Sequence, residues 1–297
     1  MYPQESKYFN NNHEYWERIL DERPQNVINT FIREGMIVNT SLEFIVSYKY
    51  KIVELKEMLK QRGYTSSGKK NELVNRIIQA DKEGMEKSTA GIEFLVCTQV
   101  GREIAEQYKS SEQEIRFKIE QQVFDCVIKR LFYEASLLAA TYIEKTPESI
   151  GLGSSWKRTS PEVIAEIVKQ IFNSKPEIIS KLEDVNLEPL RIGAAMMEIW
   201  GESTATKWLP TNFKTGLSIG NDSAARMLIF NATNIRNLKQ YKESGFKFVE
   251  VLGAPNSCPF CKEIAGKHFA IGEAPTLPNH NCTHELGCRC LYLAYVE

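Results

Sequence analysis

The fold class of this chain follows from one stretch, residues 104–142, which reads IAEQYKSSEQEIRFKIEQQVFDCVIKRLFYEASLLAATY. It contains no proline and no glycine, the two residues that most often break a helix. Its apolar side chains recur every three or four positions, as they do on one face of an α-helix; they are Ile115, Ile119, Val123, Val127, Leu131, Ala135 and Leu138. The wider segment 88–146 is therefore predicted to form two or three helices.

Helical spacing is also found nearer the N-terminus, where it predicts short helices packed on a neighbour. The apolar residues with this spacing are Trp16, Ile19, Leu20, Val27, Phe31 and Ile32. On the C-terminal side of the long stretch, Gly151 and Gly153 predict a loop over residues 147–155.

Residues 160–250 are again predicted to be helical. Ser160 and Pro161 provide an N-cap and a first helical position, which are the usual start signals. Residues 222–244 form a long patterned helix, and residues 246–251 then alternate in the manner of a strand. Three prolines are expected to separate the segments that lie between: Pro176, Pro189 and Pro210.

These patterns predict a mainly α fold, with helical domains and a small β-containing module at the C-terminus. We expect an N-terminal helical segment at 1–48, a helix–loop–helix unit at 49–84, helical domains at 88–150 and 155–245, and the C-terminal module at 246–297.

Composition excludes several classes of protein. The chain has 297 residues, of which 42% are hydrophobic and 10% aromatic, so it can bury a core and is not globally disordered. Its net charge is -1, from 37 basic and 38 acidic residues, which excludes coating of nucleic acid by bulk charge. A local basic patch remains compatible with this balance.

The sequence predicts neither a membrane span nor a signal peptide. No run of 18 apolar residues is present, and residues 1–5 lack a basic start and an apolar segment. We therefore expect a cytoplasmic location, in a host or bacterial cell, with the virion as a further site. In such a reducing compartment, clustered cysteines indicate metal ligands before disulfides.

Five of the seven cysteines fall between residues 258 and 290. Cys258 and Cys261 form a C-x-x-C pair, and the second group follows about twenty residues later, a common gap between zinc-binding turns. Zinc prefers four thiolate or imidazole ligands in a tetrahedron, and seven candidates are present: Cys258, Cys261, His280, Cys282, His284, Cys288 and Cys290. The predicted ligands are Cys258, Cys261, Cys282 and one of Cys288 and Cys290. Four protein ligands leave no position for water, which favours a structural site.

Three other interpretations of the cluster are open. The C-x-x-C pair could be redox-active, although no β-α-β context surrounds it. A catalytic zinc could use Glu263 or Glu285 as a base. The cysteines could also be oxidised in pairs if the protein is part of a virion.

Residues 223–290 resemble the C-terminal part of phage head morphogenesis proteins of the Mu protein F type. The resemblance rests on an ordered series of short motifs: Ala225-Arg226, Asn231, Tyr241, Gly245, Cys258-Pro259-Phe260-Cys261, Gly266-Lys267-His268-Phe269, Ala274-Pro275-Thr276-Leu277-Pro278 and Cys288-Arg289-Cys290. It implies a minor capsid or head morphogenesis role, with capsid or portal proteins as partners. The chain departs from the family at 281–287, where the last motif is longer and contains the additional Cys282.

A second resemblance lies within 49–84. A helix from Lys51 to Gln61 is stopped by Gly63, and a second helix begins near Lys70 after a short loop. Residues 51–78 resemble a SAP motif, a helix–extended loop–helix module that binds DNA. The residues that match are Val53, Leu55, Leu59, Lys60, Gly63, Gly68, Lys70, Leu73, Val74, Arg76 and Ile77.

The basic residues of this unit predict contacts with the phosphates of duplex DNA, with little base specificity. The predicted DNA-binding residues are Lys56, Lys60, Arg62, Gly68, Lys69, Lys70 and Arg76. Glu54, Glu57 and Glu72 dilute the positive charge, so a solvated helical hairpin or a protein-docking element is the competing interpretation.

No catalytic motif is recognisable. Gly151 and Gly153 lack the Gly-Lys-Ser/Thr of a phosphate-binding loop, and no G-x-S-x-G turn is present. The sequence therefore predicts a non-enzymatic, DNA-binding, zinc-containing protein of phage or prophage head morphogenesis. The alternatives are a bacterial SAP-domain zinc protein acting in DNA regulation or repair, and a nuclease whose active site is not recognised.

Overall fold

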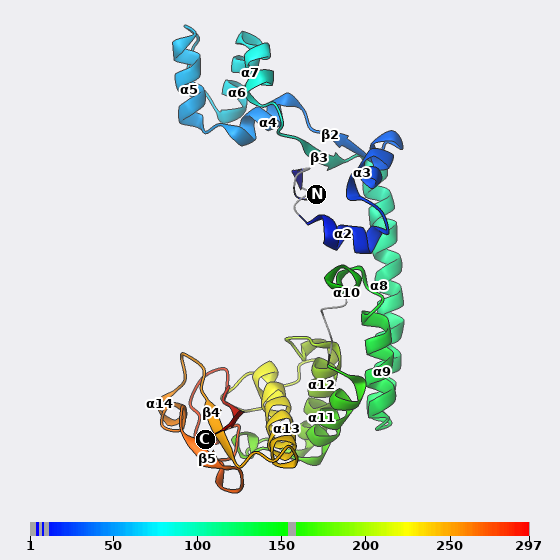
Figure 1. Ribbon diagram of the computed structural model, residues 1–297, viewed down its shortest axis with the longest axis vertical. Helices are drawn as coiled ribbons and strands as arrows, with labels where there is room; N and C mark the ends of the chain where they lie inside the picture. Colours follow the sequence, from blue (N-terminus) through cyan, green and yellow to red (C-terminus); the bar gives the residue numbers. More distant parts are fainter. Residues whose placement is uncertain (1–3, 6–7, 9–11, 154–158, 297) are drawn as a thin grey trace. The chain divides into compact units, whose positions relative to one another are not determined.

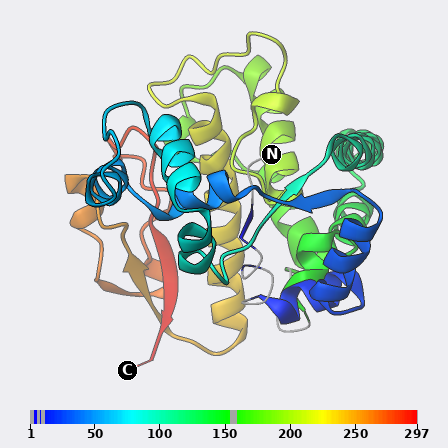
Figure 2. The same ribbon diagram turned by 90° about the horizontal axis from the view of Figure 1, so that it is seen from above.

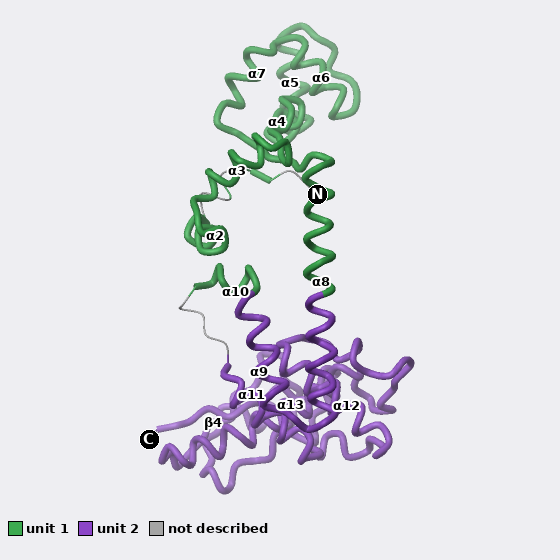
Figure 3. Tube along the Cα trace, turned by 90° about the vertical axis from the view of Figure 1, so that its right-hand side faces the viewer, with its two compact units in different colours: residues 1–114, 146–156 green, residues 115–145, 157–297 purple. Residues whose placement is uncertain are grey.

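The computed structural model describes residues 4–5, 8, 12–153 and 159–296, and this part of the chain is mainly α-helical (Figure 1). Two compact units are present (Figure 3): residues 1–114 with 146–156, and residues 115–145 with 157–297. Each contains a small antiparallel sheet of three strands. The predicted mainly α fold is thus confirmed. None of the described helices has both the length and the apolar character needed to cross a membrane.

Unit 1 contains the N-terminal helices, the helix–loop–helix segment and the first part of a long helix. Its elements are β1 (Gln4–Glu5), α2 (His13–Leu20), α3 (Pro24–Arg33), β2 (Ile37–Asn39), α4 (Leu42–Lys49), α5 (Ile52–Gln61), α6 (Lys70–Ala80), α7 (Lys82–Ser88), β3 (Phe94–Cys97), α8 (Gln99–Ile128, to residue 114) and α10 (Pro147–Leu152). The two short N-terminal helices and the α5–α6 pair confirm the sequence pattern.

The sheet of unit 1 is a feature that the helical patterns missed. β3 pairs with both β1 and β2, in the order β1-β3-β2, with Ile37 opposite Cys97 and Gln4 opposite Leu95. β3 lies within 88–146, for which only helices were predicted. Strands of this length carry little periodicity of their own, and their hydrogen bonds come from segments that are distant in sequence.

The glycine-containing segment at 147–155 is a helix over 147–152, not a loop. Thr146 caps α10, since its Oγ1 accepts a hydrogen bond from the Ser149 N–H at 3.5 Å, and Pro147 occupies the first turn. A Cβ on Gly151 would lie 2.3 Å from a ring carbon of Tyr15, so this glycine allows α10 to approach α2 closely. Residues 154 and 155 of the expected loop lie outside the described residues.

Unit 2 holds the remaining helices and the C-terminal sheet. Its elements, after the second part of α8, are α9 (Phe132–Ile143), α11 (Pro161–Asn173), η1 (Glu177–Ile179), α12 (Asp184–Trp200), η2 (Thr206–Trp208), α13 (Asn221–Glu243), β4 (Phe248–Leu252), α14 (Pro259–Lys262), β5 (His268–Ala270), η3 (Ile271–Glu273) and β6 (Leu291–Tyr295). The sheet order is β5-β4-β6, and β6 lies beside α13 (Figure 2).

One detail of unit 2 departs from the prediction, and a second fits the two or three helices predicted for 88–146 but lies at a position that was not predicted. Pro189 does not separate two segments, because it lies in the second turn of α12, where only the hydrogen bond to the exposed Val185 is lost. The proline-free stretch 104–142 is interrupted at Arg130, which adopts a left-handed φ of 64° between α8 and α9. Sequence patterns missed this turn because neither glycine nor proline marks it.

Candidate metal centre and candidate nucleic-acid interface

The five C-terminal cysteines come together in unit 2. Cys258 is the N-cap of α14, Cys261 lies within that helix, and Cys288 and Cys290 directly precede β6. The Sγ atoms form two groups of three, each with all atoms within 4.8 Å of one another: Cys258, Cys261 and Cys282 in one, and Cys261, Cys288 and Cys290 in the other. Cys261 therefore belongs to both groups.

The sulfur–sulfur distances fit zinc coordination. The Sγ atoms of Cys258 and Cys282 lie 3.7 Å apart, and those of Cys261 and Cys288 lie 3.8 Å apart. A Zn–S bond of about 2.3 Å in a tetrahedral site gives an S···S edge of about 3.8 Å. A set of thiols with this spacing could hold a metal ion, and zinc is one of the metals that such donors favour.

Neither candidate histidine joins the thiols. His284 accepts a hydrogen bond from the Leu286 N–H at 3.1 Å through Nδ1, and its Nε2 contacts the Arg289 guanidinium at 3.0 Å. His280 Nδ1 lies 3.4 Å from the Glu177 carboxylate. The described cysteines are all unbridged thiols.

Backbone N–H donors, burial and neighbouring thiols shift the pKa values of these cysteines in different directions. Burial opposes ionisation of Cys258, but the backbone N–H groups of Thr283 and Cys261 outweigh it and lower its pKa to about 7. A hydrogen bond from the Cys290 thiol, together with backbone donors, lowers the pKa of Cys288 to about 6. Burial raises the pKa of Cys261. Each group of three thus contains one cysteine that ionises near neutral pH and attracts a cation.

The helix–loop–helix segment has a hydrophobic core of its own. Leu55 and Leu59 of α5 pack against Leu73 and Ile77 of α6, and all four are fully buried. Helices α4 and α7 contribute Val46 and Met85 to the same core, which surrounds the contact between α5 and α6. Val53, one of the apolar residues that match the SAP motif, is 72% exposed.

Two glutamates cap the helices of this segment. Glu54 Oε2 accepts from the Lys51 N–H at 2.6 Å, and Glu72 Oε2 accepts from the Lys69 N–H at 3.1 Å. Gly68 makes the second cap possible, since it has a φ of 124° and its Cβ would lie 2.4 Å from Glu72 Oε2. The Glu72 carboxylate therefore lies at the α6 N-terminus, where the free backbone N–H groups would otherwise favour a phosphate.

The two arginines predicted to bind DNA are engaged within the segment. Arg76 Nη1 donates to the carbonyls of Thr65 and Ser67, at 2.6 and 2.9 Å, and so holds the loop between the helices. Arg62 forms an ion pair of 2.6 Å with Asp81. This side-chain hydrogen bond, with one from the Gly84 N–H, holds the pKa of Asp81 below its usual value. Sequence spacing did not indicate either intramolecular role.

The lysines differ from the arginines. Lys60 and Lys69 are exposed, and Lys56 and Lys70 are half-buried. None of the ion pairs among the described residues involves these four ammonium groups. They are therefore predicted DNA-binding residues whose side chains can reach an external phosphate without breaking an internal ion pair.

The comparison with protein families decides the nature of this segment. Residues 49–82 match the family model of the SAP domain. They form a SAP domain. The match confirms the SAP resemblance and associates this part of the chain with nucleic-acid binding. No match is found among curated proteins or solved structures, so the resemblance of residues 223–290 to head morphogenesis proteins stays a prediction.

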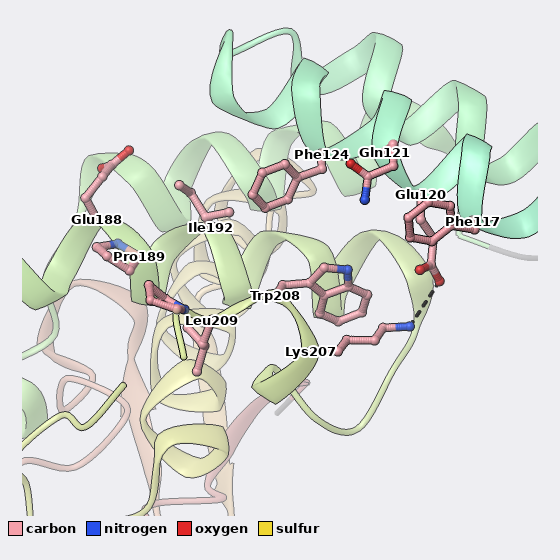
Figure 4. Close-up of a pocket in the computed structure, with 11 residues that line it drawn as sticks. Phe117, Glu120, Gln121, Phe124, Glu188, Pro189, Ile192, Lys207, Trp208 and Leu209 are labelled. Carbon is pink, nitrogen blue, oxygen red and sulfur yellow. Dashed lines mark hydrogen bonds and ion pairs between the residues drawn. The ribbon is translucent and has the colours of Figure 1, made fainter. Parts of the chain in front are cut away.

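A separate cleft of about 640 Å³ lies in unit 2 and has mostly apolar walls (Figure 4). Its charged side chains are already paired: Lys207 contacts Glu120 at 3.0 Å, and Glu188 is bound to Arg130. Residues from α8, α12 and the η2 region line it: Phe117, Glu120, Gln121, Phe124, Glu188, Pro189, Ile192, Lys207, Trp208, Leu209 and Pro210. These paired charges do not form a nucleophile–base arrangement within the described part of unit 2.

Proposed function

We propose that this chain is a non-enzymatic DNA-binding protein of the phage or prophage head morphogenesis type, stabilised by a structural zinc ion. The observation that carries DNA binding is the SAP domain, in which the predicted contacts Lys56, Lys60, Lys69 and Lys70 take part in none of the ion pairs among the described residues. Such lysines bind phosphates as point charges and do not read bases, so the proposed ligand is duplex DNA with low sequence specificity.

The internal contacts of the SAP domain assign different roles to its basic residues. Arg62 and Arg76 hold the fold and its loop, while Lys56, Lys60, Lys69 and Lys70 would contact the DNA backbone. The loop glycine, Gly68, would allow the backbone to approach the DNA. Because Glu72 already caps α6, the lysine side chains would contribute more to phosphate binding than the helix terminus.

The zinc site would connect the two halves of the C-terminal module. Cys258 and Cys261 from the α14 turn, with Cys282 and the Cys288/Cys290 pair from the second half, would hold the ion. When bound, zinc supplies a rigid four-ligand cross-link. A closed thiolate site has no position for a reactive water, which supports a structural role.

The head morphogenesis role rests on the motif order in residues 223–290. It implies capsid or portal proteins as partners, and the protein would then occur in the cytoplasm of the host or bacterial cell, with the virion as a further site. Association with heads is tested by sedimenting particles from an induced lysogen and assaying them for this chain. DNA affinity without particle association would favour a role in bacterial regulation or repair.

The DNA-binding proposal is tested with Lys69→Glu/Lys70→Glu. Loss of two phosphate contacts should weaken duplex binding and reduce the slope of log K against log salt by about 2. The measurement is fluorescence anisotropy on a labelled duplex at several salt concentrations. Lys242→Glu/Lys247→Glu, two exposed positions of unit 2, matches the charge change and should leave the slope unaltered.

Lys70 is half-buried, so Lys69→Gln/Lys70→Gln is measured in parallel as a milder variant. A wild-type protein without duplex affinity at low salt would contradict the proposal and leave the SAP domain as a protein-docking element.

The non-enzymatic assignment is tested with Glu263→Gln and Glu285→Gln, which are exposed and should leave zinc content and any measured turnover unaltered.

A further inference from the structure

The metal site contains more thiols than a tetrahedral ion needs. Five cysteines lie in the two overlapping groups, and four are sufficient for zinc. Both close pairs, Cys258–Cys282 at 3.7 Å and Cys261–Cys288 at 3.8 Å, have the length of a tetrahedral edge. The two pairs share no atom, so an ion bound by both would have four thiolate ligands and no position for Cys290.

Cys290 is nevertheless placed to coordinate. Its Sγ lies within 4.8 Å of the sulfurs of both Cys261 and Cys288, and its side chain is buried. Its backbone is held by β6, which begins at the next residue, and by the Asn234 side chain, whose Nδ2 donates to the Cys290 carbonyl at 3.4 Å. The thiol is therefore kept beside the site by the fold and not by the metal.

Cys282 has the opposite surroundings. It lies in the irregular segment between η3 and β6, it is half-buried, and it lines a polar cleft of about 460 Å³ together with His280 and Lys181. A ligand on such a segment can leave the metal with less disturbance of the core than a ligand anchored to a strand.

We propose that Cys258, Cys261 and Cys288 are permanent zinc ligands and that Cys282 and Cys290 are interchangeable at the fourth position. This inference rests on the structural zinc proposed above. In the exchange, the Zn–S bond to Cys282 breaks and one to Cys290 forms. The thiol proton of Cys290 passes to the released Cys282 thiolate. The ion would have four thiolate ligands before and after the exchange, and the net charge of the site would be unaltered.

The test compares the zinc content of full-length variants purified without added metal. Wild type should contain about one zinc per chain. Cys282→Ala and Cys290→Ala should each retain about one zinc, with affinity in chelator competition reduced about 10- to 100-fold, as when a residue beside the ligands is lost. Cys282→Ala/Cys290→Ala and Cys261→Ala should lose the ion. Cys126→Ala is the matched control outside the cluster.

Cobalt substitution adds a readout that does not depend on stability. The thiolate-to-cobalt charge-transfer band reports the number of bound thiolates and should keep the intensity of four in both single variants. Zinc loss in Cys282→Ala alone, or in Cys290→Ala alone, would overturn the exchange and identify one fixed set of four ligands. A metal-free wild type would instead contradict the zinc site itself, and with it the exchange.

Discussion

The SAP domain and the C-terminal cysteine module are both small, but they are stabilised in different ways. The SAP domain buries Leu55, Leu59, Leu73 and Ile77 in a core made only by residues of α4 to α7. The cysteine module has no such independent core. Its strand residues and its cysteines belong to one hydrophobic cluster with residues of α11, α12 and α13.

Contacts with α13 show how closely the module depends on the helices. A Cβ on Gly287 would lie 2.7 Å from the Met227 sulfur, and Tyr241 donates to the Tyr292 carbonyl at 3.3 Å. A short segment can thus fold around its own leucines, or it can share the core of its neighbours and, as proposed for this module, bind a metal. This difference predicts that a destabilising substitution in the SAP domain affects that domain alone. One in the cysteine module should also destabilise the helices that share its core.

The largest effect is expected for Cys261→Ala, since this residue belongs to both thiol groups. Structural zinc contributes about 10–16 kcal/mol to small zinc-binding peptides, so loss of the ion should unfold residues from about 246 onward. Destabilisation should extend into α13, because both share one core. Hydrogen exchange of the full chain checks this, and unaltered protection of α13 would show that the module is independent.

A smaller and local effect is expected for Leu59→Ala. A fully buried leucine in a well-packed core costs about 2–5 kcal/mol when truncated to alanine. Peptides from α4 to α7 should exchange faster, while zinc content and exchange in unit 2 stay at wild-type values. Val53→Ala is the control, because Val53 is exposed. Loss of zinc in Leu59→Ala would contradict the separation of the two regions.

Gly68→Ala should have the next effect, about 1–3 kcal/mol on the SAP domain, because alanine disfavours a φ of 124° and its Cβ would displace the Glu72 cap. Gly63→Ala shares the positive φ but meets no atom within 4 Å, so it should cost less. Chemical unfolding followed by hydrogen exchange ranks the two. Equal losses would show that the Glu72 cap contributes little.

The smallest effect is expected for Asp81→Asn, which removes the exposed ion pair with Arg62 but keeps an N-cap for α7. The folded-state pKa of Asp81 is lowered, so its contribution is present above the unfolded pKa and is lost as pH falls through the folded one. The SAP domain of the variant should be slightly less stable at pH 7, with the difference vanishing in acid. Stability measured from pH 7 to pH 3 checks the sign, and a difference that grows in acid would contradict it.

Local signals in the sequence determined much of this protein. Helix α5 was predicted from Lys51 to Gln61 and spans Ile52–Gln61, because apolar spacing and a stopping glycine both act within one helix. Helix α13 was predicted over 222–244 and spans Asn221–Glu243 for the same reason. The SAP resemblance and the cysteine cluster also came from residues close together in the chain.

Only the tertiary structure decided the features that depend on residues far apart. The pairing of Arg62 with Asp81, the hold of Arg76 on its loop and the position of Cys261 in both thiol groups require atoms from separate elements to meet. Likewise, β3 pairs with β1 and β2, from which it is separated in sequence by several helices, and Gly151 packs on Tyr15. Periodicity shows which side of an element is apolar, but the partner it meets depends on how the whole chain closes around its core.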